Sequence, residues 1–114
     1  MSMNRKTYNK LIRDKIPEII KKDNAVSKVS VLDDKRYAIA LKEKLVEEAK
    51  ELLEAKTPEE ILNELSDVLE LVESIATNNK LTIAEVEKQK LAKKEKRGGF
   101  EKKLFLEYVD EPSK

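Results

Sequence analysis

Residues 45–77 read LVEEAKELLEAKTPEEILNELSDVLELVESIAT. Apolar residues recur every three or four positions on both sides of a short break, which is the spacing of amphipathic helices. The break, Thr57-Pro58-Glu59-Glu60, is a helix start, because Thr can cap a helix, Pro fits its first position and Glu completes a capping box. The stretch therefore predicts a helix over about residues 35–55 and a second one ending near Thr77, joined by a tight turn as antiparallel neighbours.

Two further helices are predicted outside this central pair. Asp14 can cap a short helix over about residues 14–23, and Pro17 fits its first turn. Thr82-Ile83-Ala84-Glu85 repeats the capping-box pattern, and Gly98-Gly99 supplies a left-handed position that ends the resulting helix. Together with the central pair, these segments predict four helices.

Two short segments carry strand signals instead. Residues 27–32 alternate polar and apolar side chains, and residues 103–109 are rich in aliphatic and aromatic ones. They could pair as a ribbon packed on the helices, because a two-stranded ribbon is marginal alone. We therefore expect one all-α domain over residues 1–114, a four-helix antiparallel bundle-like domain with a small two-stranded β-ribbon.

Composition restricts the chemistry open to the chain. Of its 114 residues 41% are charged, yet the net charge is only +1, which creates no field that would recruit nucleic acid or an anionic membrane. The absence of Cys and His excludes thiol chemistry, thiolate zinc sites and imidazole bases, so any bound metal should be a hard cation with oxygen ligands. No apolar run reaches the ~20 residues of a membrane span, and the first residues lack the apolar core of a signal peptide. We expect a cytoplasmic protein without membrane or nucleic-acid partners.

Two pairs of acids stand out in the central helices. Glu48 and Glu51 form an E-x-x-E pair, and Glu64 and Asp67 form an E-x-x-D pair. Residues three apart share one face of a helix, so each pair could hold a common cation. Both pairs lie at similar distances from the turn at Thr57, so they should meet at the same height. In a chain with 23 acids such spacings also arise on ordinary solvated faces, which is the alternative interpretation.

Helical geometry separates these four acids from the others. At about 100° per residue, Glu64 lies inside the apolar arc of its helix, and Glu48 lies at the border of the apolar stripe of the other. Three neighbouring acids point away and are interpreted as solvated: Glu43, Glu47 and Glu54. Carboxylates about 6 Å apart repel by ~3 kcal/mol per pair at an effective dielectric of about 20, so a cluster of four needs protons or a cation. Oxygen ligands alone point to Mg²⁺, or to Mn²⁺ as a substitute.

Basic residues on the last predicted helix are candidates for contacting substrate phosphates: Lys90, Lys93, Lys94 and Arg97. Arg97 is the strongest of them, because the small Gly98-Gly99 would let a phosphate approach closely. Lys10 and Arg13 are further candidates near the other end of the chain. The alternative is a solvated basic face whose cations offset the helix dipole.

The E-x-x-E pair, twelve intervening residues and the E-x-x-D pair resemble the all-α nucleoside triphosphate pyrophosphohydrolase superfamily. The opening run Tyr8–Pro17, and the run Lys93–Phe100 before a predicted strand, are similar to its MazG-like group, and the resemblance covers nearly the whole chain. It implies magnesium ligation by four residues: Glu48, Glu51, Glu64 and Asp67. It also implies cleavage of nucleoside triphosphates, including non-standard ones, to nucleoside monophosphate and pyrophosphate.

A catalytic role and an assembly follow from the same interpretation. Glu48 or Glu51 is the candidate acceptor for the proton of an attacking water whose pKa a bound metal lowers. The core of so short a chain is small, and MazG-like proteins are commonly dimers or tetramers, so we expect a homodimer or homotetramer that binds a nucleotide substrate.

Three other functions fit parts of the same sequence. Phosphoribosyl-ATP hydrolysis could use the same acids, and product analysis on both substrates would separate the two activities. A non-catalytic helical interaction module would carry the acids merely as surface charges. Nucleic-acid binding through residues 90–97 is a third alternative, for which so small a basic patch predicts weak and salt-sensitive affinity.

Overall fold

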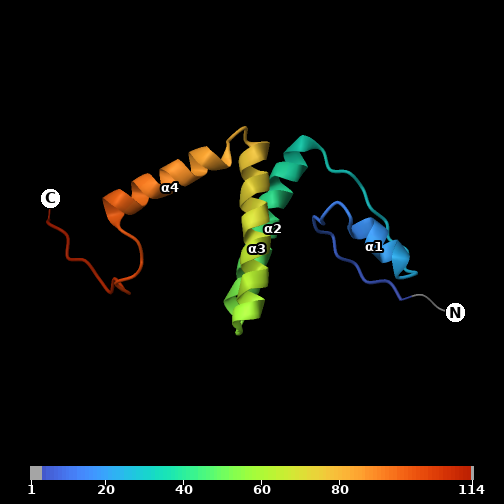
Figure 1. Cartoon of the computed structure of the whole chain (residues 1–114), viewed down its shortest axis with the longest axis horizontal. Coiled ribbons are helices and arrows are strands. Elements are labelled where there is room, and N and C mark those ends of the chain that lie inside the picture. Colours follow the sequence, from blue (N-terminus) through green and yellow to red (C-terminus); the bar gives the residue numbers. More distant parts are fainter. Residues whose placement is uncertain (1–3, 114) are drawn as a thin grey trace. The chain divides into compact units, whose positions relative to one another are not determined.

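The computed structural model describes residues 4–113, which contain four α-helices. They are α1 (Ile16–Lys22), α2 (Asp34–Glu54), α3 (Pro58–Asn78) and α4 (Ile83–Arg97) (Figure 1). The all-α part of the predicted fold is confirmed. The chain divides into two compact units, Met1–Leu81 with α1 to α3 and Thr82–Lys114 with α4, and we describe each by itself. The single-domain organisation therefore stays a prediction.

Local capping chemistry places the starts of α3 and α4 where the sequence predicts them. The hydroxyl of Thr57 accepts a hydrogen bond from the backbone N–H of Glu60, whose carboxylate accepts from the backbone N–H of Thr57, and this closes the capping box. Thr82 caps α4 by accepting from the backbone N–H of Glu85. Gly98 follows the end of α4 with a φ of 85°, a conformation that a residue without Cβ adopts at little cost.

The start of α1 differs from the prediction. The helix begins at Ile16 with Lys15 at the N-cap position, and no side chain caps it, so Asp14 does not have the predicted capping role. Pro17 lies in the first turn as predicted, where its missing N–H has no helical acceptor to lose. With Lys15 at the N-cap, Asp14 lies one position before the residue whose side chain would accept from the N–H groups of the first turn.

The first unit is organised around a hairpin of α2 and α3, which pack side by side (Figure 1). Its buried apolar side chains are Leu41 from α2 and Leu71 and Ala76 from α3. Five further apolar residues of the two helices are half-buried: Leu45, Leu52, Val68, Val72 and Ile75. Only Ala55, Lys56 and Thr57 separate the two helices, so a given height on α2 faces a fixed height on α3. The hairpin thereby sets the register of every side chain that points between the helices.

The predicted β-ribbon is wrong. Within residues 4–113 no segment is a strand, and the stretches 27–32 and 103–109 are irregular. A ribbon gains stability from burying one face, yet Val31 is 97% exposed and Leu104 is 87% exposed. Lys103 also has a φ of 59°, which turns the backbone away from the extended conformation where the second strand would begin. The apolar alternation of these segments therefore has no packed surface to stabilise it.

Large apolar side chains also remain exposed on the outer faces of the hairpin. On α2 these are Ile39, Val46 and Leu53, and on α3 they include Leu62, Leu65 and Leu69. Leu65 and Leu69 belong to the apolar arc that periodicity predicts to be buried, so the hairpin covers only part of that arc. None of the helices among the described residues has the length and apolar character that crossing a membrane requires.

Candidate metal centre

Three of the four predicted acids converge between α2 and α3. Glu48 and Glu51 come from successive turns of α2, and Glu64 comes from the facing turn of α3. One carboxylate oxygen from each residue lies within 4.8 Å of those of the other two. The short turn at Thr57 explains the meeting, because both helices leave it in antiparallel directions and carry their acids at the same height.

Two oxygens of this cluster lack any hydrogen-bond partner. Glu48 is only 6% exposed, and its Oε2 atom is buried and unpaired, as is Oε2 of Glu64. An ionisable group rarely stays buried without a partner, because leaving such a group unsatisfied costs roughly 1–3 kcal/mol or more. Hard divalent cations take just such carboxylate oxygens as ligands. The donor set of Glu48, Glu51 and Glu64 therefore fits a magnesium or manganese ion.

Asp67, the fourth predicted ligand, lies beside this cluster and has a different partner. Arg13 donates a hydrogen bond to Oδ1 of Asp67 at 2.8 Å, and the two side chains are 57% and 29% exposed. Asp67 nevertheless acts electrostatically on the cluster, since its negative charge contributes to raising the pKa of Glu48. Asp67 is thus a neighbour of the three converging acids, and its own carboxylate is already paired with Arg13.

The surroundings raise the pKa of both acids that α2 contributes, Glu48 and Glu51. Burial, followed by the neighbouring carboxyl of Glu64, raises the pKa of Glu48 above its ordinary value of 4.5. The carboxyl of Glu48 in turn raises the pKa of Glu51, with burial adding to the effect. These carboxyls hold protons more tightly than free ones because burial and the neighbouring carboxyls outweigh the opposing charge of Lys44.

This shift predicts how the stability of the metal-free protein depends on pH. Glu48 and Glu51 bind protons more tightly in the folded chain than in the unfolded one, so their contribution to stability is complete below pH 4.5 and is lost as the pH rises through their raised pKa values. Urea unfolding in a chelator between pH 5 and 7.5 should therefore give a falling free energy of unfolding. The slope should be flatter in Glu48→Gln, and an equal slope in both proteins would contradict this origin.

The pKa of Glu47 shifts in the opposite direction to those of Glu48 and Glu51. From the sequence, Glu47 is interpreted as a solvated acid, yet two lysines contact it. Its carboxylate accepts a hydrogen bond from Lys10 at 2.9 Å, and Lys44 lies 3.3 Å away. The hydrogen bond from Lys10 is the main reason that the pKa of Glu47 is lowered. Lys44 is 18% exposed and also lies 3.6 Å from Glu48, so it is a cation at the edge of the cluster. Sequence analysis missed Lys44, whose (i, i+3) and (i, i+4) spacing to these acids is the signal that could have found it.

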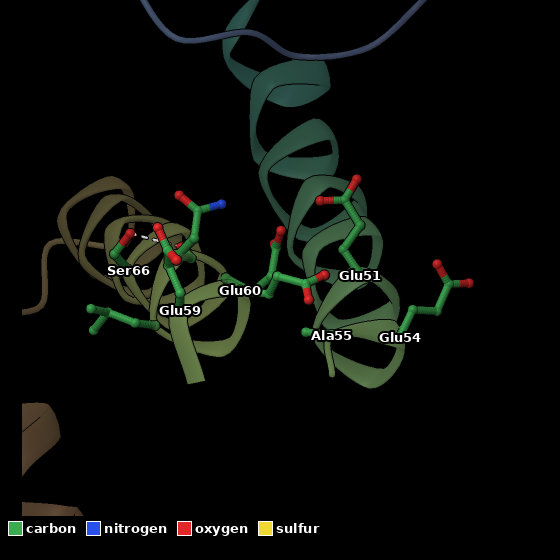
Figure 2. Close-up of a pocket in the computed structure, with 9 residues that line it drawn as sticks. Glu51, Glu54, Ala55, Glu59, Glu60 and Ser66 are labelled. Carbon is green, nitrogen blue, oxygen red and sulfur yellow. Dashed lines mark hydrogen bonds between the residues drawn. The ribbon is translucent and has the colours of Figure 1, made fainter. Parts of the chain in front are cut away.

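An acid-lined hollow of about 760 Å³ adjoins the cluster, where α2 ends and α3 begins (Figure 2). Five carboxylates line it: Glu51, Glu54, Glu59, Glu60 and Glu64. The remaining lining residues are uncharged: Ala55, Leu62, Asn63 and Ser66. None of its lining residues is basic. A polyanionic ligand could enter such a hollow only with cations, because like charges would otherwise repel it.

The predicted phosphate-binding residues fall in both units. Lys10 and Arg13 lie at the acids of the hairpin through their ion pairs with Glu47 and Asp67. The four basic residues of α4 are all exposed and belong to the second unit, so their role stays a prediction: Lys90, Lys93, Lys94 and Arg97. Within that unit, Nζ of Lys94 lies 4.0 Å from a carboxylate oxygen of Glu101.

Comparison of the chain with models of protein families, with curated proteins and with solved structures gives no match in any of the three. The resemblance to MazG-like proteins therefore stays a hypothesis that depends on the quoted motifs. Support for a function has to come from the chemistry of the carboxylate cluster itself.

Proposed function

We propose that this chain is a magnesium-dependent hydrolase that cleaves nucleoside triphosphates to nucleoside monophosphate and pyrophosphate. The observation that carries the proposal is the buried and unpaired Oε2 of Glu48 at the point where carboxylates from two helices meet. Lys44 lies 3.6 Å from the other oxygen of this carboxylate, Oε1, so Oε2 is the atom left without a partner. A buried carboxylate oxygen without a partner is unfavourable in a protein that performs no chemistry there, whereas a site for a divalent cation requires one. The choice of the bond between the α- and β-phosphates follows from the motif resemblance.

The residues have separable roles in this proposal. Glu48, Glu51 and Glu64 would hold the metal, with Asp67 as a further ligand. A bound Mg²⁺ would offset phosphate charge and lower the pKa of a water. Glu51 is the better candidate for the proton acceptor, because it is exposed while Glu48 is buried. Water oxygen forms a bond to the α-phosphorus, the bond to the bridging oxygen breaks, pyrophosphate leaves with that electron pair, and the carboxylate takes the water proton.

A nucleotide panel tests the activity. The wild-type protein would be incubated with Mg²⁺ and each standard nucleoside triphosphate, several modified ones and phosphoribosyl-ATP, and the products would be separated. The expected result is equimolar monophosphate and pyrophosphate from at least one triphosphate, with no activity in a chelator. Preference for phosphoribosyl-ATP would indicate the alternative activity, and inert behaviour towards the whole panel would favour a non-catalytic interaction module.

We also propose that the chain associates with a second copy through the hairpin. Ile39, Val46 and Leu53 lie seven residues apart on α2 and are 52%, 55% and 86% exposed. This spacing forms an apolar seam of the kind that packs against another helix, and a net charge of +1 does not oppose self-association. Three buried apolar side chains also give the hairpin little stability alone, because helices depend on packing.

Sedimentation measures this association directly. At a concentration of tens of micromolar we expect two or four times the 13.1 kDa of one chain, and the double variant Val46→Gln, Leu53→Gln should shift the mass towards one chain. Leu91→Gln, which replaces an apolar residue of α4 that is 61% exposed, serves as the control. A wild-type protein that sediments as a single chain would contradict the proposal.

A further inference from the structure

The N-terminal segment before α1 reaches the α2–α3 hairpin through two ion pairs. Lys10 contacts Glu47 at 2.9 Å, and Arg13 contacts Asp67 at 2.8 Å. In each pair the partners are distant in the sequence, by 37 and 54 positions. The other side-chain hydrogen bonds of the described residues join partners three or four positions apart, so these two are the polar contacts that bring distant parts together. One pair ends on Glu47, which precedes Glu48 in α2, and the other ends on Asp67, the fourth predicted ligand.

Arg13 holds an acid that the cluster would need. Asp67 lies one turn after Glu64 on α3, and its charge is felt at Glu48, yet its Oδ1 atom accepts from the guanidinium of Arg13. A divalent cation among the acids and the guanidinium at Asp67 would repel each other and compete for the same carboxylate. Arg13 is therefore an internal cation that takes the place of part of the metal's charge.

The same guanidinium is suited to a triphosphate. It is attached to a side chain that is 57% exposed, and the hydrogen bond to Asp67 uses one of its nitrogens, so further N–H donors face solvent. Its planar fork matches phosphate oxygens as well as carboxylates. Lys10 and Lys44, the other cations near the cluster, are less exposed, with exposed fractions of 39% and 18%. Arg13 is thus the most exposed of the three cations that pair with acids at or next to the cluster, and the adjoining hollow has no basic residue in its lining.

We propose that Arg13 exchanges partners during binding: it pairs with Asp67 in the metal-free protein and moves to the substrate's phosphates when a divalent cation takes Asp67. This inference rests on the proposed function, because it assigns a specific role within the same site. Arg13 has two effects of opposite sign in this scheme. It opposes binding of the bare metal ion, and it favours binding of the metal–nucleotide complex.

The opposite signs give a test that a purely structural role for Arg13 would not reproduce. Binding of Mn²⁺ alone would be measured by calorimetry for the wild type, Arg13→Gln and Arg13→Lys, and KM and kcat would be measured for the preferred triphosphate. Arg13→Gln should bind Mn²⁺ at least threefold more tightly, while its KM rises about tenfold and kcat changes little. Arg13→Lys retains the charge without the planar fork, so it should lie between the two. The exposed Arg36→Gln on the first turn of α2 should match the wild type.

The outcomes separate this inference from the proposed function. A wild-type protein that binds no Mn²⁺ overturns both. A second outcome is a wild-type protein that binds Mn²⁺ and hydrolyses a triphosphate while Arg13→Gln binds Mn²⁺ no more tightly than the wild type. That result overturns the exchange of partners and leaves the proposed function standing. An unchanged KM in Arg13→Gln overturns the phosphate contact. Circular dichroism melting of each variant shows whether the hairpin is intact, so weaker binding through misfolding is recognised as such.

Discussion

Replacing Glu64 by glutamine is expected to lower kcat by roughly a thousandfold while the helices stay folded. Glu64 is the one acid that α3 contributes to the cluster of three, and its buried Oε2 is unpaired and available to a cation. Glutamine keeps the size of the side chain but removes its charge, and the amide nitrogen cannot ligate. The expected loss corresponds to ~4 kcal/mol of transition-state stabilisation, in keeping with the several kcal/mol that a catalytic metal supplies.

The matched control is Glu54→Gln. Glu54 lines the same hollow and lies one turn after Glu51, but it is exposed and outside the cluster. Its replacement should change kcat by less than about twofold, because it removes a charge without removing a ligand. Pyrophosphate release would be measured for both variants alongside their melting temperatures. Equal activity of Glu64→Gln and the wild type, at equal helicity, would remove Glu64 from the site.

Replacing Glu48 by glutamine should have opposite effects with and without metal. In a chelator the variant should be more stable than the wild type by about 1 kcal/mol, which is several degrees in melting temperature. A neutral amide replaces a buried carboxylate whose Oε2 is unpaired, and we expect this gain to exceed the loss of the 3.6 Å ion pair between Oε1 and Lys44. With Mg²⁺ at about 100 times its Kd the wild type should gain ~2.7 kcal/mol, and the variant should gain almost none. The order of the two melting temperatures therefore reverses when metal is added.

Thermal unfolding with and without Mg²⁺ measures this reversal, and Glu43→Gln is the control. Glu43 is an exposed acid of the same helix, and its replacement should leave both melting temperatures close to those of the wild type. Magnesium that stabilises Glu48→Gln as much as the wild type would show that the ion binds elsewhere. A metal-free variant less stable than the wild type would show that the ion pair of Glu48 with Lys44 outweighs the cost of burying the unpaired Oε2.

The parts of the structure that the sequence predicts well depend on neighbours along the chain. The capping box at Thr57 involves residues three positions apart, so its pattern can be read directly. The meeting of Glu48 and Glu64 follows from helical periodicity and a short turn, which are also local. The half-burial of Glu64 agrees with its place in the apolar arc of α3. For these residues, spacing alone gives the geometry.

The parts that the sequence does not predict depend on contacts between distant segments. The pairing of Arg13 with Asp67 spans 54 positions, and nothing in the residues around either partner indicates it. Periodicity shows that Leu65 lies on an apolar face but cannot show what covers that face, and the residue is 49% exposed. The β-ribbon is wrong for the same reason, since alternation identifies a possible strand without identifying its partner. Local patterns thus give helices and ligand spacing, while tertiary contacts need the structure.

The short connection between α2 and α3 has a consequence for the order of folding events. Glu48 and Glu64 lie 16 positions apart, so the loop that has to close before they meet is small and its entropic cost is low. Helical hairpins with such low contact order form within microseconds to milliseconds. A divalent ion could therefore be captured by a nascent hairpin while the rest of the polypeptide is still unstructured, and ion concentration would then affect the rate of refolding as well as its end point.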